Sequence, residues 1–175
     1  MRLFHVSENE FISEFVPRTP DRDDLDPDMP LVWAIDEEHL ANYLTPRDCP
    51  RVAYHVTWET SEDDRRRFFT SPTHRDALVI ESGWFEIMRG TTLWLYEFAP
   101  QEFELQDAAA GYYTAKTTQT PIGKYCIDDL FAELFLRGVE VRIVDNLHAI
   151  ADEVERSTLA WSCCRMRNAV DGEVW

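Results

Sequence analysis

The chain has 175 residues, of which 45% are hydrophobic and 13% aromatic, and its formal net charge is −16. This length suits one domain, and the apolar content excludes an intrinsically disordered chain. The negative charge repels phosphate backbones and acidic lipid surfaces, so neither nucleic acid nor a membrane is expected as a partner. We therefore predict a single domain over residues 1–175 and leave its oligomeric state open.

The N-terminal stretch Met1–Glu8 has no apolar segment of signal-peptide length, and the longest uninterrupted apolar runs have four or five residues. A membrane-spanning helix needs about 18. The four cysteines and five histidines lack the spacings of a zinc site. The sequence thus predicts a cytoplasmic protein without a metal site.

The first predicted element is a strand at Leu3–Ser7. The stretch Pro17–Pro30 holds four prolines and five aspartates, which predicts a loop long enough to serve as a lid. A strand follows at Leu31–Ile35, and Asp36 can cap a helix that ends before Pro46.

Alternating apolar residues predict strands in the middle of the chain at Val52–Trp58, Ala77–Glu81, Leu93–Phe98, Phe103–Gln106 and Tyr112–Thr117. Short helices are expected at Thr60–Arg67 and Trp84–Arg89, and we expect Gly90 to end the second of these as a left-handed cap.

An amphipathic helix is predicted at Ile127–Arg137, with one apolar face formed by Ile127, Leu130, Phe131, Leu134 and Phe135. Gly138 ends it, and a strand at Val139–Val144, a helix at Leu147–Val154 and a short strand at Leu159–Cys163 follow.

This order of elements predicts an α+β fold with a mixed, mainly antiparallel sheet and peripheral helices. The residues expected to be buried are Trp33, Tyr54, Val79, Leu95, Leu130, Leu134 and Ile143.

Several motifs that would name a chemistry are absent from the sequence. It contains no Gly-rich dinucleotide or P-loop motif, no GxSxG nucleophile elbow and no HExxH helix. Function must therefore be argued from smaller groups of residues.

The first group is His5 and Ser7, which lie two residues apart and so share one face of the predicted first strand, opposite Arg2. Either His5 binds a ligand at the end of the sheet, or it is a strand-edge histidine whose ring is hydrogen-bonded to the backbone.

Two further groups are rich in aromatic residues. Trp33 and Tyr43 lie in the strand–helix segment after the Pro/Asp loop, where Tyr43 can pack in the core and still offer a flat wall to a ligand. The polar run Gly111–Ile122 carries two tyrosines and ends in a Thr-Pro turn, which also suits an exposed strand.

Five signatures make Met1–Ala169 resemble an uncharacterised bacterial domain family of similar length. They are Leu3–Glu8, Val32–Glu38, Leu44–Val52, Ala110–Tyr113 and Arg165–Ala169.

More distantly, the order of a first-strand histidine, a strand–helix segment with a tyrosine, and a late polar strand is similar to the ADP-ribosyltransferase superfamily of the His-Tyr-Glu type. The resemblance implies NAD as cofactor, with His5 on the ribose, Tyr43 stacked on the nicotinamide and Gln119 as the late catalytic residue. The sequence departs from that pattern because no Glu or Asp lies between Ala108 and Ile127.

Two functions follow as hypotheses. The first is an NAD-binding protein of ADP-ribosyltransferase type, active or degenerate. Its site would join His5, Ser7, Trp33, Tyr43 and Gln119, with Arg47 or Arg51 on the pyrophosphate because a guanidinium matches phosphate geometry. The second is a non-enzymatic module that binds a protein partner. The first requires His5, Tyr43 and Gln119 to converge on one cleft.

Overall fold

The computed structural model describes residues 1–19, 28–108 and 110–171, and these residues form ten β-strands and four α-helices. One sheet is entirely antiparallel and the other is mixed, so the predicted α+β class is confirmed. Residues 20–27 of the predicted Pro/Asp loop lie outside the described residues. On either side of them, Arg18 and Leu31 exchange two backbone hydrogen bonds of 3.0 and 2.9 Å.

The chain divides into two compact units, and each is built from two separate stretches of sequence. The first unit comprises Met1–Tyr43 and Thr92–Ile127, and the second comprises Leu44–Thr91 and Asp128–Trp175. That residues 1–175 behave as one domain stays a prediction.

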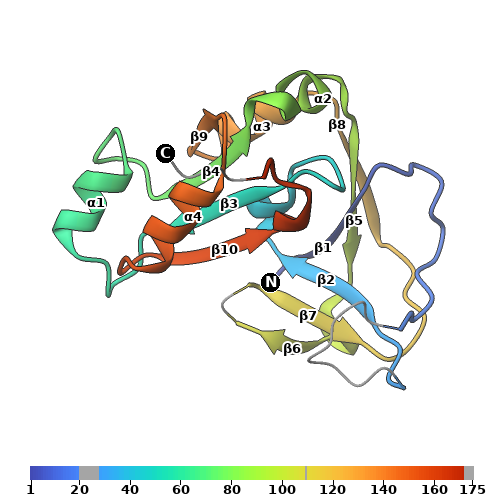
Figure 1. Ribbon diagram of the computed structural model, residues 1–175. Coiled ribbons are helices and arrows are strands. Elements are labelled where there is room, and N and C mark those ends of the chain that lie inside the picture. The colour runs from blue at the N-terminus through green and yellow to red at the C-terminus, as the bar shows by residue number, and fades with distance from the viewer. Residues whose placement is uncertain (20–27, 109, 172–175) are drawn as a thin grey trace. The chain divides into compact units, whose positions relative to one another are not determined.

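The first unit is a six-stranded antiparallel sheet with the order β6-β7-β2-β1-β5-β8 (Figure 1). Its strands are β1 (Leu3–Ser7), β2 (Val32–Asp36), β5 (Leu93–Phe98), β6 (Glu104–Asp107), β7 (Tyr112–Ala115) and β8 (Gly123–Ile127).

One face of this sheet carries a small apolar core. The core consists of Leu3, Val32, Ala34, Phe98, Phe103 and Ala115, with Phe15 and Tyr113 packed against it. Because His5 is two residues from Leu3 on the same strand, its side chain belongs to this face.

The second unit is a four-stranded sheet with the order β10-β3-β4-β9, in which β4 and β9 run parallel. Its strands are β3 (Arg51–His55), β4 (Asp76–Glu81), β9 (Val139–Val144) and β10 (Ala160–Cys164). Its helices are α1 (Glu62–Phe68), α2 (Phe85–Gly90), α3 (Leu130–Leu136) and α4 (His148–Glu155).

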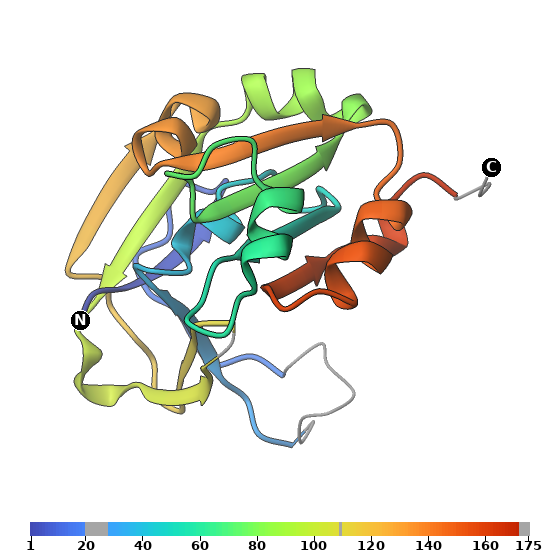
Figure 2. The same cartoon turned by 90° about the vertical axis from the view of Figure 1, so that its left-hand side faces the viewer.

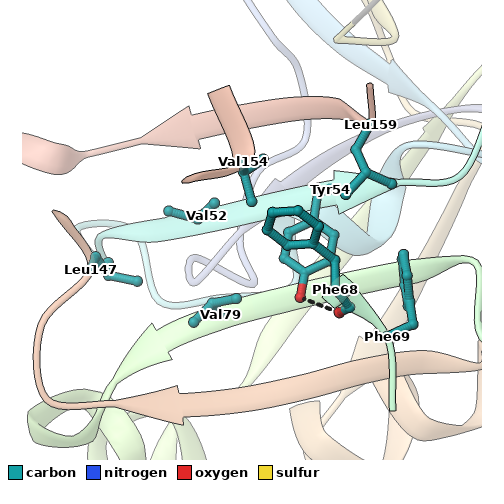
Figure 3. Close-up of a cluster of buried hydrophobic side chains, with 9 residues drawn as sticks. Val52, Tyr54, Phe68, Phe69, Val79, Leu147, Val154 and Leu159 are labelled. Carbon is teal, nitrogen blue, oxygen red and sulfur yellow. Dashed lines mark hydrogen bonds between the residues drawn. The ribbon is translucent and has the colours of Figure 1, made fainter. Parts of the chain in front are cut away.

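A buried cluster joins α1 and α4 to one face of the second sheet, and both helices lie on the same side of this sheet in Figure 2. Figure 3 shows the side chains of the cluster. The Tyr54 ring packs against the rings of Phe68 and Phe69, and its hydroxyl group donates a hydrogen bond of 3.0 Å to the Phe68 carbonyl oxygen. The cluster consists of Val52, Tyr54, Phe68, Phe69, Ala77, Val79, Leu147, Val154 and Leu159.

Three predicted strands have the expected bounds: Leu3–Ser7, Leu93–Phe98 and Val139–Val144. The strand β8 was not predicted, and the expected helix after Asp36 is only a 3₁₀ turn at Leu40–Tyr43. The other predicted strands and helices are present with shifted ends.

The two glycine caps have different outcomes. Gly138 follows α3 with φ of 74°, which confirms its role as the end of that helix. Gly90 is instead the last residue of α2 and is not among the glycines with positive φ, so its predicted left-handed cap is wrong.

The helix predicted from Ile127 begins three residues later, because the Asp129 carboxylate caps it by accepting from the Ala132 amide. Ile127 belongs to β8. Leu134 is buried, but Phe135 is one residue further around the helix and is 80% exposed, so the prediction that both share the core face is wrong.

Tyr54, Val79, Leu95, Leu130 and Leu134 are buried as predicted. Trp33 is only half-buried. Ile143 is 46% exposed, against prediction, because β9 is an edge strand and has a neighbour on one side only.

Candidate functional site

His5 lies where two neighbouring strands of the first unit separate. β1 pairs with β5 along all five of its residues, but it pairs with β2 only through Leu3 and Phe4. Beyond this point the His5 ring takes over the link to β2, because its Nδ1 atom lies 3.0 Å from the Trp33 carbonyl oxygen. The His5 ring is thus hydrogen-bonded to the backbone at the end of the ladder, which is the contact that the strand-edge interpretation predicts.

This contact fixes the role of each ring nitrogen of His5. A carbonyl oxygen can only accept, so Nδ1 carries the hydrogen and donates it. In the neutral imidazole Nε2 then holds the lone pair and acts as an acceptor. The backbone of β2 therefore selects one tautomer of His5.

Phe15 connects His5 to Gln119. Its ring centroid lies 4.8 Å from that of His5, and it packs edge-to-face with Tyr96 and Phe98 at centroid distances of 5.2 and 5.0 Å. Its backbone exchanges two hydrogen bonds with Gln119, of 2.8 and 2.9 Å. Phe15 therefore contacts both of the residues predicted to be catalytic.

The amide of Gln119 has a defined orientation. Its Nε2 atom lies 2.8 Å from Thr117 Oγ1 and 3.2 Å from the Thr117 carbonyl oxygen. The carbonyl can only accept, so the NH₂ group faces Thr117 and Oε1 points the other way. Gln119 is 8% exposed, and within the described residues no donor is bonded to Oε1.

Trp33 and Tyr43 belong to an aromatic group on the opposite face of the sheet from His5. The Tyr112 ring lies 5.3 Å from Trp33 and 5.6 Å from Tyr43, centroid to centroid. Phe4 pairs with Ile35, and Ile35 with Tyr112, which puts this group on the Phe4 face. Tyr43 therefore does not share a face with His5, as the ADP-ribosyltransferase hypothesis requires, and contact of Trp33 and Tyr43 with the same ligand stays a prediction.

Close by this aromatic group, Gly111 touches the His39 ring. Gly111 has φ of +67°, and a Cβ atom added there would lie 2.4 Å from His39 Nδ1. The same Nδ1 atom is 2.8 Å from an Asp36 carboxylate oxygen, which also accepts from the His39 amide. Only glycine fits here, and the contact packs the start of β7 against the turn after β2.

Ser7 shares the His5 face, as predicted, but its hydroxyl oxygen accepts from the Asn9 amide at 3.1 Å. Arg2 points to the other face, where it pairs with Glu97 at 2.8 Å and Glu37 at 2.8 Å. Its hydrogen bonds, with one from Tyr125, lower the pKa of Glu97 to about 2. Arg2 therefore forms a surface ion-pair network instead of contributing to the candidate site.

Arg47 and Arg51, predicted to contact a pyrophosphate, belong to the second unit. Arg51 is buried and donates to the Cys49 carbonyl at 3.2 Å. Arg47 is exposed, and its own carbonyl accepts from Arg165 Nε at 3.3 Å. Their part in ligand binding stays a prediction.

Sequence reasoning missed Phe15, which is remote in sequence from Gln119 and reaches it only through an isolated backbone pairing. Tyr112 and Thr117 both lie inside the predicted Gly111–Ile122 run, so the sequence did carry a signal for them.

Within residues 1–19, 28–108 and 110–171, no cluster of three or more His, Cys, Asp or Glu side chains could hold a metal ion. In the same ranges, no helix has both the length and the apolar character needed to cross a membrane.

Residues 4–169 match the model of a family of unknown function (DUF6886), and the chain belongs to this family. The predicted resemblance to a domain family without an assigned function is thereby confirmed. No curated protein and no solved structure gave a match. None of these comparisons supports the resemblance to ADP-ribosyltransferases, which therefore belongs to the proposal below.

Proposed function

We propose that the first unit binds a ribose-containing nucleotide, with NAD as the first candidate, and that His5 and Gln119 hold its ribose. The observation that carries the proposal is that both side chains present an acceptor whose direction is fixed by a backbone carbonyl. His5 donates to Trp33, which makes Nε2 the acceptor of the neutral ring, and Gln119 donates to Thr117, which turns Oε1 the other way.

Two acceptors suit a ligand that offers two donors. The vicinal hydroxyl groups of a ribose are such donors, whereas a phosphate or carboxylate offers acceptors only. Phe15 touches the His5 ring and exchanges hydrogen bonds with the Gln119 backbone, so both residues lie beside the same phenylalanine. The resemblance to the ADP-ribosyltransferase superfamily supports the same ligand.

Binding is the primary activity in this proposal. Gln119 is neutral, so it can accept from a hydroxyl group but supplies no charge to the oxocarbenium-like cation of ADP-ribosyl transfer. Any transfer activity would therefore be weak, and release of nicotinamide from NAD would measure it.

A thermal-shift screen with NAD, NADP, ADP-ribose and nicotinamide tests the proposal. A ligand at 100 times its dissociation constant stabilises a protein by about 2.7 kcal/mol, which is a readily measured shift. We expect NAD or ADP-ribose to raise the melting temperature and nicotinamide, which has no ribose, to leave it unchanged. If none of the ribose compounds shifts it, the proposal is wrong.

A second candidate function, binding of a protein partner, is favoured by large apolar side chains on the surface. Trp58 is 90% exposed and Phe135 is 80% exposed. A partner captured by the parent and by His5→Ala, but lost in Phe135→Ala, would support this alternative.

A further inference from the structure

We propose that Glu102 is a positioning residue of the candidate nucleotide site, and that it acts through Thr117 to fix the direction of the Gln119 amide. The proposal rests on the proposed function for the identity of the ligand. The positioning itself can be measured in the free protein, so the two can fail separately.

Strand pairing explains why Glu102 reaches this place. It ends the 3₁₀ turn Pro100–Glu102 just before β6, and β6 pairs antiparallel with β7 through Glu104 and Thr114. Glu102, two residues before Glu104, therefore lies beside the residues that follow Thr114. The Thr117 hydroxyl oxygen is accordingly 3.2 Å from Glu102 Oε2.

The chemistry of each group gives the chain of hydrogen bonds one direction. The NH₂ group of Gln119 has two hydrogens, which go to the carbonyl and the hydroxyl oxygen of Thr117. The hydroxyl group has one hydrogen, and the carboxylate of Glu102 can only accept it. Glu102 thus makes Thr117 Oγ1 an acceptor toward Gln119.

Removing the carboxylate removes this constraint. The Thr117 hydroxyl can then rotate and donate elsewhere, so the Thr117 carbonyl alone is left to hold the NH₂ group of Gln119 in a fixed direction. Hydrogen bonds to an ionised group are also stronger than neutral ones, so the chain is held more firmly with Glu102 present. With Glu102 present, the amide oxygen of Gln119 therefore points away from Thr117, toward a bound ribose, for a larger fraction of the time.

This arrangement bears on the departure from the ADP-ribosyltransferase pattern. The run from Ala108 to Ile127 contains no acid. Glu102 supplies a carboxylate to the same neighbourhood from outside that run, but it reaches Gln119 through a threonine and is not placed against the ligand. It orients an acceptor and does not replace a catalytic carboxylate.

The first test uses the ligand-free protein. NMR follows hydrogen exchange at the Gln119 side-chain NH₂ group in the parent, in Glu102→Ala and in Glu104→Ala, a matched control because Glu104 is an exposed acid two residues away. We expect exchange to be about tenfold faster in Glu102→Ala only, the ratio expected for a loss of about 1.4 kcal/mol. Equal exchange in the parent and Glu102→Ala would overturn the proposal.

A double-mutant cycle shows whether Glu102 acts through Thr117. Thr117→Val, at an exposed position, should raise the exchange rate like Glu102→Ala, and combining the two should add nothing. Additive effects would mean that Glu102 acts by another route and would also overturn the proposal.

The second readout is affinity for NAD. Glu102→Ala should weaken binding about three- to tenfold without a change in melting temperature, while Glu104→Ala should bind like the parent. If the parent does not bind NAD but the exchange rates change as expected, the proposed function fails and the positioning role stands. Unchanged affinity in Glu102→Ala overturns the role at the site.

Discussion

The Nδ1 atom of His5 donates to the carbonyl oxygen of Trp33 at 3.0 Å, at the residue where β1 stops pairing with β2. The imidazole therefore replaces a backbone contact that the separating strands no longer make. It also acquires one fixed tautomer, which leaves Nε2 as the acceptor. A residue held in this way is suited to recognise a donor such as a ribose hydroxyl group.

Of the apolar residues in the segment after β1, Phe15 should contribute most to the stability of the fold and to the orientation of the His5 ring. Phe15→Ala removes the ring contacts with His5, Tyr96 and Phe98, and we expect it to lower the free energy of unfolding by about 2 kcal/mol, less than a fully buried phenylalanine. Imidazole ¹⁵N chemical shifts should also show His5 losing its single tautomer.

The matched control is Phe11→Ala in the same segment, because Phe11 is 84% exposed. We expect a change within about 0.5 kcal/mol and an unchanged His5 tautomer. Equal effects of the two substitutions in urea unfolding and NMR would show that Phe15 does not hold His5.

Two leucines of α3 provide a test of the packing in the second unit. Leu134 is fully buried, whereas Leu136 is 78% exposed. Leu134→Ala should cost roughly 2–5 kcal/mol, as buried leucines do, and Leu136→Ala should cost less than about 0.5 kcal/mol. Chemical denaturation measures both, and similar costs would mean that the helix faces are assigned wrongly.

Glu140 should make stability depend on pH. Burial opposes its ionisation, but Thr70 donates to it through its backbone and hydroxyl groups, and Arg142 and His74 donate as well. Together these hydrogen bonds hold its pKa at about 2. A carboxylate whose pKa is depressed in the folded state stabilises the protein above its unfolded pKa of about 4.3 and loses this effect as the pH falls.

Glu140→Gln should therefore be less stable than the parent at pH 6, and the difference should shrink as the pH falls from 5 toward 2. Glu62→Gln, at an exposed position on α1, is the control and should show no such trend. Urea unfolding across this pH range measures both differences. A constant difference for Glu140→Gln would mean that the hydrogen bonds do not favour its ionised form.

The chain connections predict cooperative unfolding of the two units. Each unit consists of two separate stretches, with boundaries at Tyr43, Thr91 and Ile127, so neither unit is a continuous piece of chain. We expect one calorimetric transition whose calorimetric and van't Hoff enthalpies agree. Two resolved transitions would show that the single-domain prediction is wrong.

Local patterns were sufficient for much of the secondary structure. The strands Leu3–Ser7, Leu93–Phe98 and Val139–Val144 have clear apolar content, and Gly138 marks a helix end. The pattern failed at Gly123–Ile127, where the exposed residues Lys124, Tyr125 and Cys126 give no apolar alternation. It also failed at Phe135, which lies about 100° around the helix from Leu134 and falls outside the buried face.

The candidate site was predictable only in part. His5 and Gln119 were identified from the sequence, but the residue that joins them was not. Phe15 has no motif, and its role depends on an isolated backbone pairing with Gln119 that no periodicity signals. His5 and Trp33 lie on opposite faces of the sheet because of the register of β1 with β2. The sequence alone does not give this register.

The proposed function depends on His5 accepting a hydrogen bond from the ribose of a bound nucleotide. Isothermal titration calorimetry of NAD measures this with the parent, His5→Ala and the control His148→Ala, in the second unit. We predict that the parent and His148→Ala bind equally, and that His5→Ala binds at least about tenfold more weakly while its melting temperature stays close to that of the parent. Equal affinity in His5→Ala, or no heat of binding in the parent, would contradict the claim.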